Sequence, residues 1–456
     1  MGKLKTAFVC QQCGMTANKW LGRCPDCDAW NSFLEEKASP PVGSEPHSVL
    51  ATATRPVRYA DVETDDSLRV TSGIEEFDRV LGGGIVAGSL VLLGGEPGIG
   101  KSTLLLQVAA RRGAPVVYVS GEESEQQIKL RGERLGVDAS SVLLYSETRL
   151  ERILDALKSV SPAGVVLDSV QTVYSPKFSS APGSISQVRE VTAELLYFAK
   201  STSIPVFLIG HVNKEGNLAG PKALEHMVDT VLSFEGDRHH AHRIVRTVKN
   251  RYGAAGEVGV FEMTSSGLEP VSNPSGLFLS ERPKNAPGSA VVCSLEGTRS
   301  LLLEIQTLTS TSSFGYPRRV AVGFDANRLS LLLAVLEKRA GVSLAGEDVY
   351  VNIAGGLVVS EPVADLGLVA SIASSFRGQP VDADTVFIGE VGLAGEVRSA
   401  QQMALRLKEV ARLGFRRAIV PAGNCPVNEA DVEHAELEIV GIRNIAELME
   451  LIFRVG

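Results

Sequence analysis

The chain has 456 residues, of which 44% are hydrophobic and 21% are charged, and its formal net charge at pH 7 is −8. This length predicts about two to four domains of an ordinary globular protein. The negative charge excludes a protein that coats nucleic acid over its whole surface, although a local basic patch could still bind phosphates. No apolar run reaches the roughly 18 to 20 residues that cross a membrane, and no secretory signal is evident, so we expect a cytoplasmic protein without membrane contact.

Four of the six cysteines lie close together near the start of the chain. Cys10, Cys13, Cys24 and Cys27 form two C-x2-C pairs, and each pair can turn two thiolates toward one ion. In a reducing compartment this clustering favours zinc over disulfides, with a redox role or incidental cysteines as the alternative. Four thiolates leave no open coordination position, so we expect a structural zinc module over residues 1–34.

Residues 35–65 carry several prolines among Ser, Thr and Glu with little periodicity, which predicts a linker. From residue 66 to residue 270, short apolar runs alternate with amphipathic stretches. Apolar strands separated by helices are typical of a parallel sheet that helices cover on both faces. The expected strands are residues 89–95, 115–121, 141–146, 163–169 and 204–211, and two of the expected helices are residues 102–111 and 189–201.

A phosphate-binding loop follows the first of these strands. Residues 95–103 read GEPGIGKST and match the pattern G-x4-G-K-[ST] between a strand and a helix. Its glycines allow backbone N–H groups to surround the phosphates of ATP, Lys101 reaches the β and γ oxygens, and the Ser102 hydroxyl binds Mg2+. The predicted nucleotide-binding residues are Gly95, Glu96, Pro97, Gly98, Ile99, Gly100, Lys101, Ser102 and Thr103.

Three acidic residues at strand ends are candidates for the chemistry of hydrolysis. Asp168 ends the strand over residues 163–169, where an acid can join the magnesium shell; a plain helix cap is the alternative. Glu122 and Glu123 follow the strand over residues 115–121, which we expect beside the phosphate-loop strand. Either carboxylate could orient or deprotonate the attacking water, or both could begin a solvated helix, and the sequence alone does not choose between them.

A second break, over residues 271–288, is rich in Pro, Asn and Ser and predicts another linker. Residues 289–456 again mix apolar strand-like runs with long helical patterns, among them residues 328–339 and 401–414. This pattern predicts a separate α/β domain.

Five motifs occur in the order in which bacterial RadA proteins, also called Sms, carry them: LGGGIVAGSLVLLGGEPGIGKSTLLLQ, SGEES, LDSVQT, GHVNKEGNLAGPKALEHMVDTV and KNRYG. The chain also resembles that family in its four-cysteine module and in residues 389–421, which are similar to the C-terminal part of Lon protease domains. The resemblance covers essentially the whole chain, although Tyr252 departs from the usual motif, KNRFG. It implies an α/β fold, with a RecA-like P-loop ATPase core, a small zinc-ribbon-like module and a C-terminal α/β Lon-protease-like domain.

The same resemblance implies a DNA-dependent ATPase of homologous recombination and DNA repair, with ATP, Mg2+ and Zn2+ as cofactors. Such a protein is expected to form homohexameric rings around single-stranded and branched DNA, to promote branch migration and to work with a RecA-type recombinase. Lys249 and Arg251 of KNRYG would act in trans and stabilise charge on the γ-phosphate of a neighbouring subunit's ATP. From the residues alone, this segment is a solvated basic turn between two strands.

His211 ends the strand over residues 204–211, where RecA-like proteins carry a polar residue that senses the γ-phosphate. A hydrogen-bonded histidine at a strand end is an equally good interpretation. Two flexible loops, residues 174–187 and 213–225, are expected to face the pore of the ring, and lysines in such loops suit sequence-independent contact with DNA. The candidate DNA-binding residues are Lys177, Lys214 and Lys222.

Two other functions compete with the DNA motor. An ATP-dependent Lon-like protease needs a serine nucleophile and a lysine base, but those positions fall on or near Ala364 and Ala404. We therefore expect a domain without protease activity that serves ring assembly and adds a DNA-binding face. The basic residues of that face would include Arg406, Lys408, Arg412, Arg416 and Arg417. A KaiC-like signalling ATPase shares the P-loop, LGGGI and the paired glutamates, but it is not expected to carry the four-cysteine module and the Lon-like segment.

Overall fold

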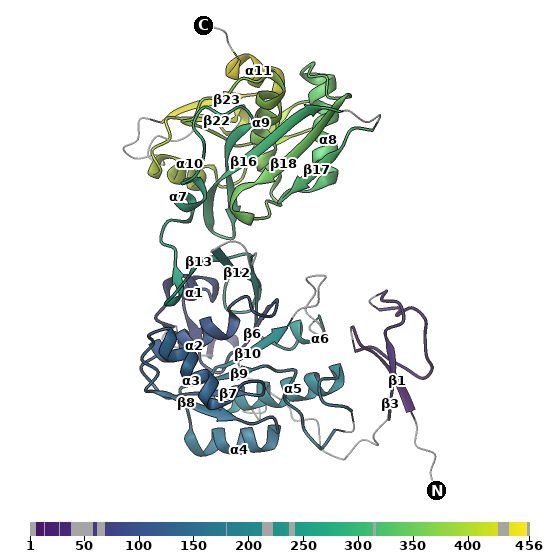
Figure 1. Ribbon diagram of the computed structural model, residues 1–456, viewed down its shortest axis with the longest axis vertical. Helices are drawn as coiled ribbons and strands as arrows, with labels where there is room; N and C mark the ends of the chain where they lie inside the picture. The colour runs from purple at the N-terminus through teal and green to yellow at the C-terminus, as the bar shows by residue number, and fades with distance from the viewer. Residues whose placement is uncertain are drawn as a thin grey trace. The chain divides into compact units, whose positions relative to one another are not determined.

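The computed structural model describes residues 6–12, 14–26, 28–37, 58–61, 69–178, 180–211, 222–236, 242–312, 316–426 and 437–453. The chain divides into two compact units, Met1–Val271 and Ser272–Gly456, whose elements are labelled in Figure 1. Each unit has its own sheets, and the N-terminal unit also contains the cysteine-rich module. None of the described helices is long and apolar enough to cross a membrane.

The cysteine-rich module is a three-stranded antiparallel sheet. Its strands, in the order β2-β1-β3, are β1 (Thr6–Cys10), β2 (Thr16–Ala17) and β3 (Phe33–Lys37). Cys10, Cys24 and Phe33 are buried together and form its small core. A core of this size does not stabilise a fold by hydrophobic burial alone, so the module needs a further stabilising element such as a bound metal ion.

The rest of the N-terminal unit is built on a nine-stranded sheet. Its strands are β6 (Leu90–Gly95), β7 (Val116–Ser120), β8 (Val142–Ser146), β9 (Gly164–Asp168), β10 (Val206–His211), β11 (Thr230–Glu235), β12 (His242–Asn250), β13 (Val258–Thr264) and β14 (Gly267–Pro270). Their order is β14-β13-β12-β11-β6-β10-β9-β7-β8. The strands from β11 to β8 run parallel, and β12, β13 and β14 extend the sheet in antiparallel fashion.

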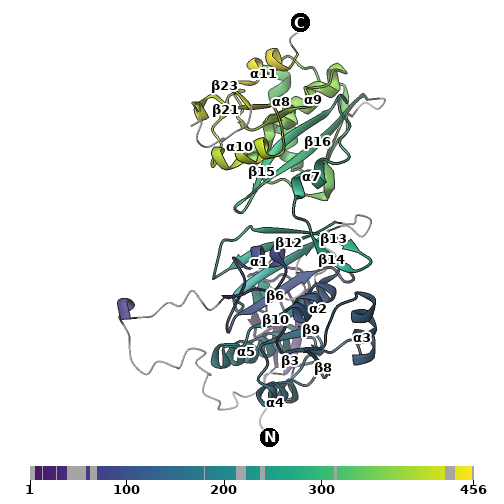
Figure 2. The same cartoon turned by 90° about the vertical axis from the view of Figure 1, so that its left-hand side faces the viewer.

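Helices cover both faces of this sheet, as Figures 1 and 2 show. They are α1 (Glu75–Val80), α2 (Lys101–Arg111), α3 (Glu125–Arg134), α4 (Leu150–Val160), α5 (Ile185–Thr202) and the short α6 (Lys222–Glu225). Alternate residues of β6 face opposite layers: Leu90 and Leu92 pack with α4 and α5, while Val91 and Leu93 pack with α1, α2 and α3. Burial on both faces explains why these strands are continuous apolar runs in the sequence. A two-stranded ribbon, β4 (Arg69–Val70) with β5 (Ile85–Val86), lies outside the sheet.

The structure confirms the five strands and two helices expected in this unit, but it corrects one neighbour relation. The expectation that the strand preceding Glu122 lies beside the phosphate-loop strand was wrong. β10 and β9 lie between β6 and β7. After β6 the chain passes over the places that β10 and β9 later occupy before it forms β7. Strands that follow one another in the sequence need not be neighbours in such a sheet.

The C-terminal unit is a second α/β structure around a seven-stranded mixed sheet. Its strands, in the order β17-β18-β16-β15-β19-β22-β23, are β15 (Ser289–Glu296), β16 (Arg299–Thr311), β17 (Arg319–Val322), β18 (Glu347–Ile353), β19 (Thr385–Phe387), β22 (Arg417–Pro421) and β23 (Glu438–Ile442). Its helices are α7 (Pro274–Leu279), α8 (Ala326–Arg339), α9 (Asp365–Arg377), α10 (Met403–Arg412) and α11 (Ile445–Ile452). A small ribbon pairs β20 (Glu390–Val391) with β21 (Val397–Arg398).

Part of the segment expected as a linker, residues 271–288, is helical. Asn273 caps α7 by accepting a hydrogen bond from a backbone N–H in its first turn, and Pro274 occupies the first helical position, where no N–H is needed. The hydroxyl of Ser275 then accepts a 3.1 Å hydrogen bond from the backbone of β16. These contacts make α7 part of the second unit.

Arg406 is buried in the C-terminal unit, which corrects its assignment to a DNA-binding face. Its side chain is 0% exposed, donates to the carboxylate of Glu361 and donates to the carbonyl oxygen of Cys293 at 2.7 Å. The physical reason is helical periodicity, because Arg406 shares the buried face of α10 with Met403 and Val410. A guanidinium held in this way cannot reach a phosphate.

Removing the charge of Glu361 should destabilise the C-terminal unit, because the Arg406 guanidinium would stay buried without its counter-ion. We expect Glu361→Gln to lower the free energy of unfolding by about 3 kcal/mol. The control Glu438→Gln breaks a more exposed ion pair with Arg417 and should cost less than about 1 kcal/mol. Hydrogen exchange read by mass spectrometry measures the opening of this unit separately. Equal effects of the two variants would contradict the prediction.

Candidate active site

The phosphate-binding loop joins the carboxyl end of β6 to α2. Gly98 and Gly100 have φ angles of 77° and 121°, which residues with a side chain rarely adopt. A Cβ atom on Gly95 would lie 2.7 Å from the carbonyl oxygen of Phe234 on the neighbouring β11, so this position also requires glycine. The loop, residues 95–103, therefore leads into a helix N-terminus whose free N–H groups favour an anion.

Lys101 is the first residue of α2 and is 4% exposed. Its ammonium donates to the carbonyl oxygens of Gly95 and Glu96, each at 2.7 Å. Burial lowers the pKa of Lys101 to about 8, while the nearby carboxylates of Asp168 and Glu122 act in the opposite direction. The lysine is thus desolvated and folded back over the loop, and phosphate oxygens would supply the negative charge that favours its protonated form.

Four neighbouring strands bring the expected hydrolytic residues to one edge of the sheet. In the order β6-β10-β9-β7, their carboxyl ends lead to the phosphate loop, His211, Asp168 and Glu122. His211 lies in register with Gly95, and Ser120 lies in register with Asp168. Because the strands are parallel, their carboxyl ends share an edge, which is where open α/β sheets bind ligands.

Asp168 ends β9 and is 5% exposed. One of its carboxylate oxygens accepts a 2.7 Å hydrogen bond from the hydroxyl of Tyr118, a fully buried residue of β7. Burial, reinforced by Asp168, raises the pKa of Tyr118, so its hydroxyl stays protonated and donates. The Asp168 carboxylate and the Ser102 hydroxyl are hard oxygen ligands of the kind that suits Mg2+.

The two glutamates after β7 have different partners. Glu122 accepts a 2.5 Å hydrogen bond from the hydroxyl of Ser169, and its Oε1 lies 3.2 Å from Nε2 of His211. Glu123 instead forms a 2.5 Å ion pair with Arg131 of α3. Glu122, and not Glu123, is among the carboxylates that raise the pKa of the phosphate-loop lysine. The geometry therefore favours Glu122 as the group that faces a bound nucleotide.

Several residues that shape this edge were not expected from the sequence. They are Tyr118, Arg131, Ser169 and Arg243. A signal exists for Tyr118, because a tyrosine within an aliphatic strand must find a partner for its hydroxyl. Arg243 of β12 is 6% exposed and donates to the carbonyl oxygen of Ile99 in the phosphate loop at 3.1 Å. No local sequence pattern predicts the contact of Arg243 with the phosphate loop, because this contact depends on how strands distant in sequence pair.

Lys249 and Arg251 lie at the opposite edge of the same sheet, the one formed by the amino ends of the parallel strands, which we call the amino edge. Asn250, the last residue of β12, is in register with Thr230, the first residue of β11, and Thr230 lies beside Val91 near the start of β6. The phosphate loop begins about 13 Å further along β6, at ~3.3 Å per residue. Neither basic side chain can therefore reach the phosphate loop of its own chain.

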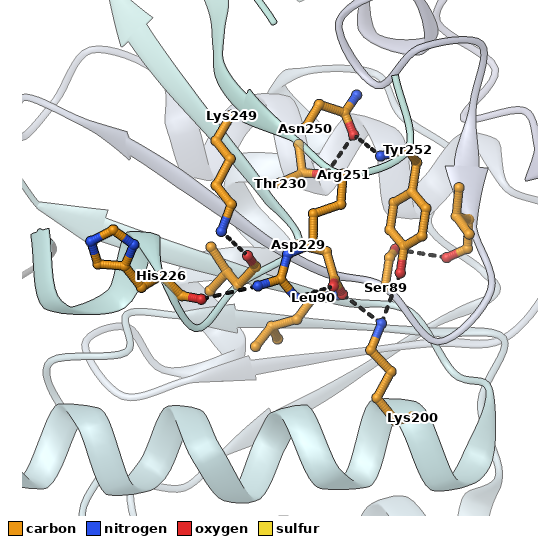
Figure 3. Close-up of polar contacts among 12 residues, drawn as sticks. Ser89, Leu90, Lys200, His226, Asp229, Thr230, Lys249, Asn250, Arg251 and Tyr252 are labelled. Carbon is orange, nitrogen blue, oxygen red and sulfur yellow. Dashed lines mark hydrogen bonds and ion pairs between the residues drawn. The ribbon is translucent and has the colours of Figure 1, made fainter. Parts of the chain in front are cut away.

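Both basic side chains have fixed partners in this structure, as Figure 3 shows. The Lys249 ammonium donates to two main-chain carbonyl oxygens at and after the end of α6, at 2.5 and 2.9 Å. Arg251 donates to the carbonyl oxygen of His226 at 3.2 Å and lies 3.5 Å from the carboxylate of Asp229. Burial lowers the pKa of Lys249, and the neighbouring guanidinium acts in the same direction. The Arg251 side chain is still 51% exposed, so positive charge is presented at this edge.

The loop after β9 contains Lys177, an exposed candidate for DNA contact. The buried amide of Gln187 organises this loop: it accepts from the N–H of Ser175 at 3.1 Å and donates to three carbonyl oxygens of the loop at 2.9 to 3.2 Å. Lys214 lies outside the described residues. Lys222 begins α6, but its side chain also lies outside what the structure describes.

The cysteine-rich module contains two matching turns. The N–H of Gly14 donates to the carbonyl oxygen of Cys10, and the N–H of Asp28 donates to that of Cys24, both at 2.9 Å. Gly14 and Asp28 also have similar positive φ angles, 76° and 61°. Buried cysteines beside two equal turns fit a zinc site built from four thiolates. The other expected ligands, Cys13 and Cys27, lie outside the described residues.

From the sequence, the catalytic dyad of a Lon-like protease is expected to fall on or near Ala364 and Ala404. Ala364 is fully buried immediately before α9, and Ala404 lies in the first turn of α10. A methyl group can act neither as nucleophile nor as base. The arrangement at these two positions therefore gives no support to proteolysis.

Two family models match parts of the chain. The model described as an AAA domain matches residues 53–217, and the model described as a rubredoxin metal binding domain matches residues 8–35. Among solved structures, the chain is similar to a KaiC-like protein from Pyrococcus horikoshii, with 22% identity and a TM-score of 0.37. That similarity covers 44% of this chain and 98% of the other.

Two relatives match almost the whole chain. The DNA repair protein RadA of Bacillus subtilis is 51% identical over 456 residues, which cover 98% of this chain and 99% of the relative. The DNA repair protein RadA of Halalkalibacterium halodurans is 49% identical, and the match covers 99% of each chain. Identity at this level over essentially the full length of both chains shows that the chain belongs to the RadA family.

Proposed function

We propose that the chain is an ATPase of DNA repair and homologous recombination that works on DNA as a ring and promotes branch migration. One observation carries the assembly part of this proposal. The phosphate loop and the basic turn with Arg251 lie at opposite edges of one sheet, so the turn cannot serve the phosphate loop of its own chain, which supports a role at the phosphate loop of another subunit. The relatives at 51% and 49% identity are DNA repair proteins, which supports DNA as the substrate of the motor.

At the carboxyl edge, Lys101 and the N–H groups of its loop would bind the phosphates of ATP. Ser102 and Asp168 would hold Mg2+, which neutralises charge on the phosphate oxygens. Glu122 would orient water and take its proton while the water oxygen bonds to the γ-phosphorus and the bond to the bridging oxygen breaks. His211 contacts Glu122 at 3.2 Å and would report the presence of the γ-phosphate.

At the amino edge, Lys249 and Arg251 would complete the site of the next subunit by stabilising charge on its γ-phosphate. A trans-acting cation of this kind requires self-association. The family resemblance favours a homohexameric ring, and the C-terminal unit, whose expected dyad positions fall on or near Ala364 and Ala404, would serve as a scaffold in that assembly.

Single-stranded and branched DNA would be the nucleic-acid partners, and a RecA-type recombinase would be the protein partner. The net charge of −8 restricts DNA contact to local groups. Lys177 suits such a role because it is exposed on a loop whose backbone is organised from within. Lys214 and Lys222 remain candidates from the sequence alone.

The first test is ATP hydrolysis by the full chain with and without single-stranded DNA, at low salt and with zinc bound. We expect DNA to raise the rate several-fold and the Lys101→Ala variant to lose hydrolysis under both conditions, because the loop then lacks the cation that binds the phosphates. A hydrolysis rate that is the same with and without DNA would instead favour a KaiC-like signalling ATPase. Degradation of casein that depends on ATP would favour a Lon-like protease.

The two glutamates after β7 should differ in their effect on the rate. Glu122→Gln removes the carboxylate beside His211 and should lower kcat by about 100-fold or more, while ATP still binds. Glu123→Gln weakens the ion pair with Arg131 and should lower kcat by less than about tenfold. Single-turnover hydrolysis and nucleotide-binding measurements would separate the two effects. The opposite ranking would assign the base to Glu123.

The cysteine-rich module should contain about one zinc ion per chain. Cys24→Ala should lose the ion, whereas Cys425→Ala, which alters an exposed cysteine of the C-terminal unit, should keep it. Zinc content is measured by mass spectrometry of metals, and the emission of Trp20 and Trp30, the two tryptophans of the chain, reports on the same module. Full zinc content in Cys24→Ala would contradict a four-thiolate site.

A further inference from the structure

The carboxylate of Asp229 is the centre of the polar contacts drawn in Figure 3. It follows α6 and precedes β11, and its side chain is 3% exposed. One oxygen accepts from the N–H of Leu90 at 3.0 Å and from the ammonium of Lys200 at 2.7 Å. The other oxygen lies 3.5 Å from the guanidinium of Arg251. A single buried anion therefore joins the start of β6, helix α5 and the basic turn.

The two cations on this carboxylate are held to different degrees. Lys200 is 24% exposed, and although burial lowers its pKa, hydrogen bonds to Asp229 and to the Tyr252 hydroxyl outweigh burial and raise it above the ordinary value. Arg251 is 51% exposed and makes the longer contact. Lys200 thus makes the closer contact with the buried charge, while the Arg251 guanidinium is oriented by Asp229 and by the carbonyl oxygen of His226 and keeps about half of its surface exposed for a phosphate of another subunit.

The backbone of the basic turn is fixed independently of these charges. The N–H of Arg251 donates to the carbonyl oxygen of Asp229 at 3.0 Å, and the N–H of Tyr252 donates to the side chain of Asn250 at 2.9 Å. The Tyr252 hydroxyl lies 2.8 Å from the Lys200 ammonium, a contact that phenylalanine at this position could not make. The turn therefore contacts Asp229 through the N–H and the guanidinium of Arg251. It is also linked to Asp229 through the Lys200 ammonium, which contacts both Asp229 and the Tyr252 hydroxyl.

We propose that Asp229, together with Lys200, is a positioning residue for Arg251 and sets the direction in which this guanidinium is offered to a neighbouring subunit. The inference rests on the proposed trans role of Arg251 and specifies what that role requires of its own chain. Asp229 lies at the amino edge of the sheet, away from the phosphate loop of its own chain, and its carboxylate is buried behind Arg251, so it would not touch the nucleotide of either subunit. Its effect should therefore be on the rate of hydrolysis in the next subunit and not on ATP binding in its own.

The test is complementation between two variants that are each impaired in DNA-stimulated hydrolysis. Asp229→Asn keeps the shape of the side chain and an acceptor for Leu90 but removes the charge that orients Arg251. We expect its kcat to fall by about tenfold or more, with KM for ATP changed by less than about twofold. Lys101→Ala lacks its own hydrolysis but has an intact basic turn.

Equal amounts of the two proteins, mixed under conditions in which subunits exchange, should recover activity. Half of the subunits then carry an intact phosphate loop, and half of those receive an intact Arg251, so random pairing predicts about a quarter of the wild-type rate per subunit. A mixture whose rate stays at the average of the two separate proteins would show that the inference is wrong.

A parallel mixture of Arg251→Ala with Lys101→Ala separates this inference from the function on which it rests. Recovery there without recovery for Asp229→Asn overturns only the positioning role. Failure of both mixtures overturns the trans role and the inference with it.

Lys200→Met provides a second variant in case Asp229→Asn does not fold. It removes the cation that fixes the carboxylate and should lower kcat several-fold, again with recovery by Lys101→Ala. An unchanged kcat for Lys200→Met would also overturn the proposal.

Discussion

The direction of β6 is the constraint on which the rest of the ATPase unit depends. Parallel pairing with β10 places His211 beside Gly95 at the carboxyl end of the strand, where the phosphate loop begins. At the amino end, Leu90 exchanges hydrogen bonds with the main chain and the carboxylate of Asp229. One strand therefore separates the nucleotide-binding edge from the edge that presents Arg251, and a rigid buried strand keeps that separation constant.

The charged residues at the carboxyl edge and at the amino edge are arranged differently. At the carboxyl edge, Lys101 is buried against main-chain carbonyl groups and near three carboxylates, and the free N–H groups at the start of α2 favour an anion. At the amino edge, a buried carboxylate is shared by Lys200 and Arg251, so an arginine is directed while it remains half exposed. Arg251 is about half exposed and can therefore contact a ligand, whereas the fully buried Arg406, paired with Glu361, contributes only to the fold.

The parts of this structure that local sequence determines could be predicted. The phosphate loop, its flanking strand and helix, and five of the six parallel strands all follow from glycine spacing and apolar runs. The order of the strands could not be predicted, because it depends on which later segments fill the gap left by the crossover after β6. The different partners of Glu122 and Glu123 could not be predicted either, since they depend on His211 from β10 and Arg131 from α3. Helical periodicity could have predicted the burial of Arg406, but basic composition suggested a surface residue instead.

Under the proposed trans role of Arg251, the placement of Arg251 and the phosphate loop at opposite edges determines the kind of contact that subunits would make. One edge of a subunit would meet a different edge of the next, so the association would be head-to-tail and would join two unlike surfaces. Repetition of such a contact closes into a ring when the rotation between subunits divides a full turn, and otherwise continues as a helical filament. In such an assembly the active unit would be the junction between two chains. A subunit by itself would supply one half of each of two different junctions.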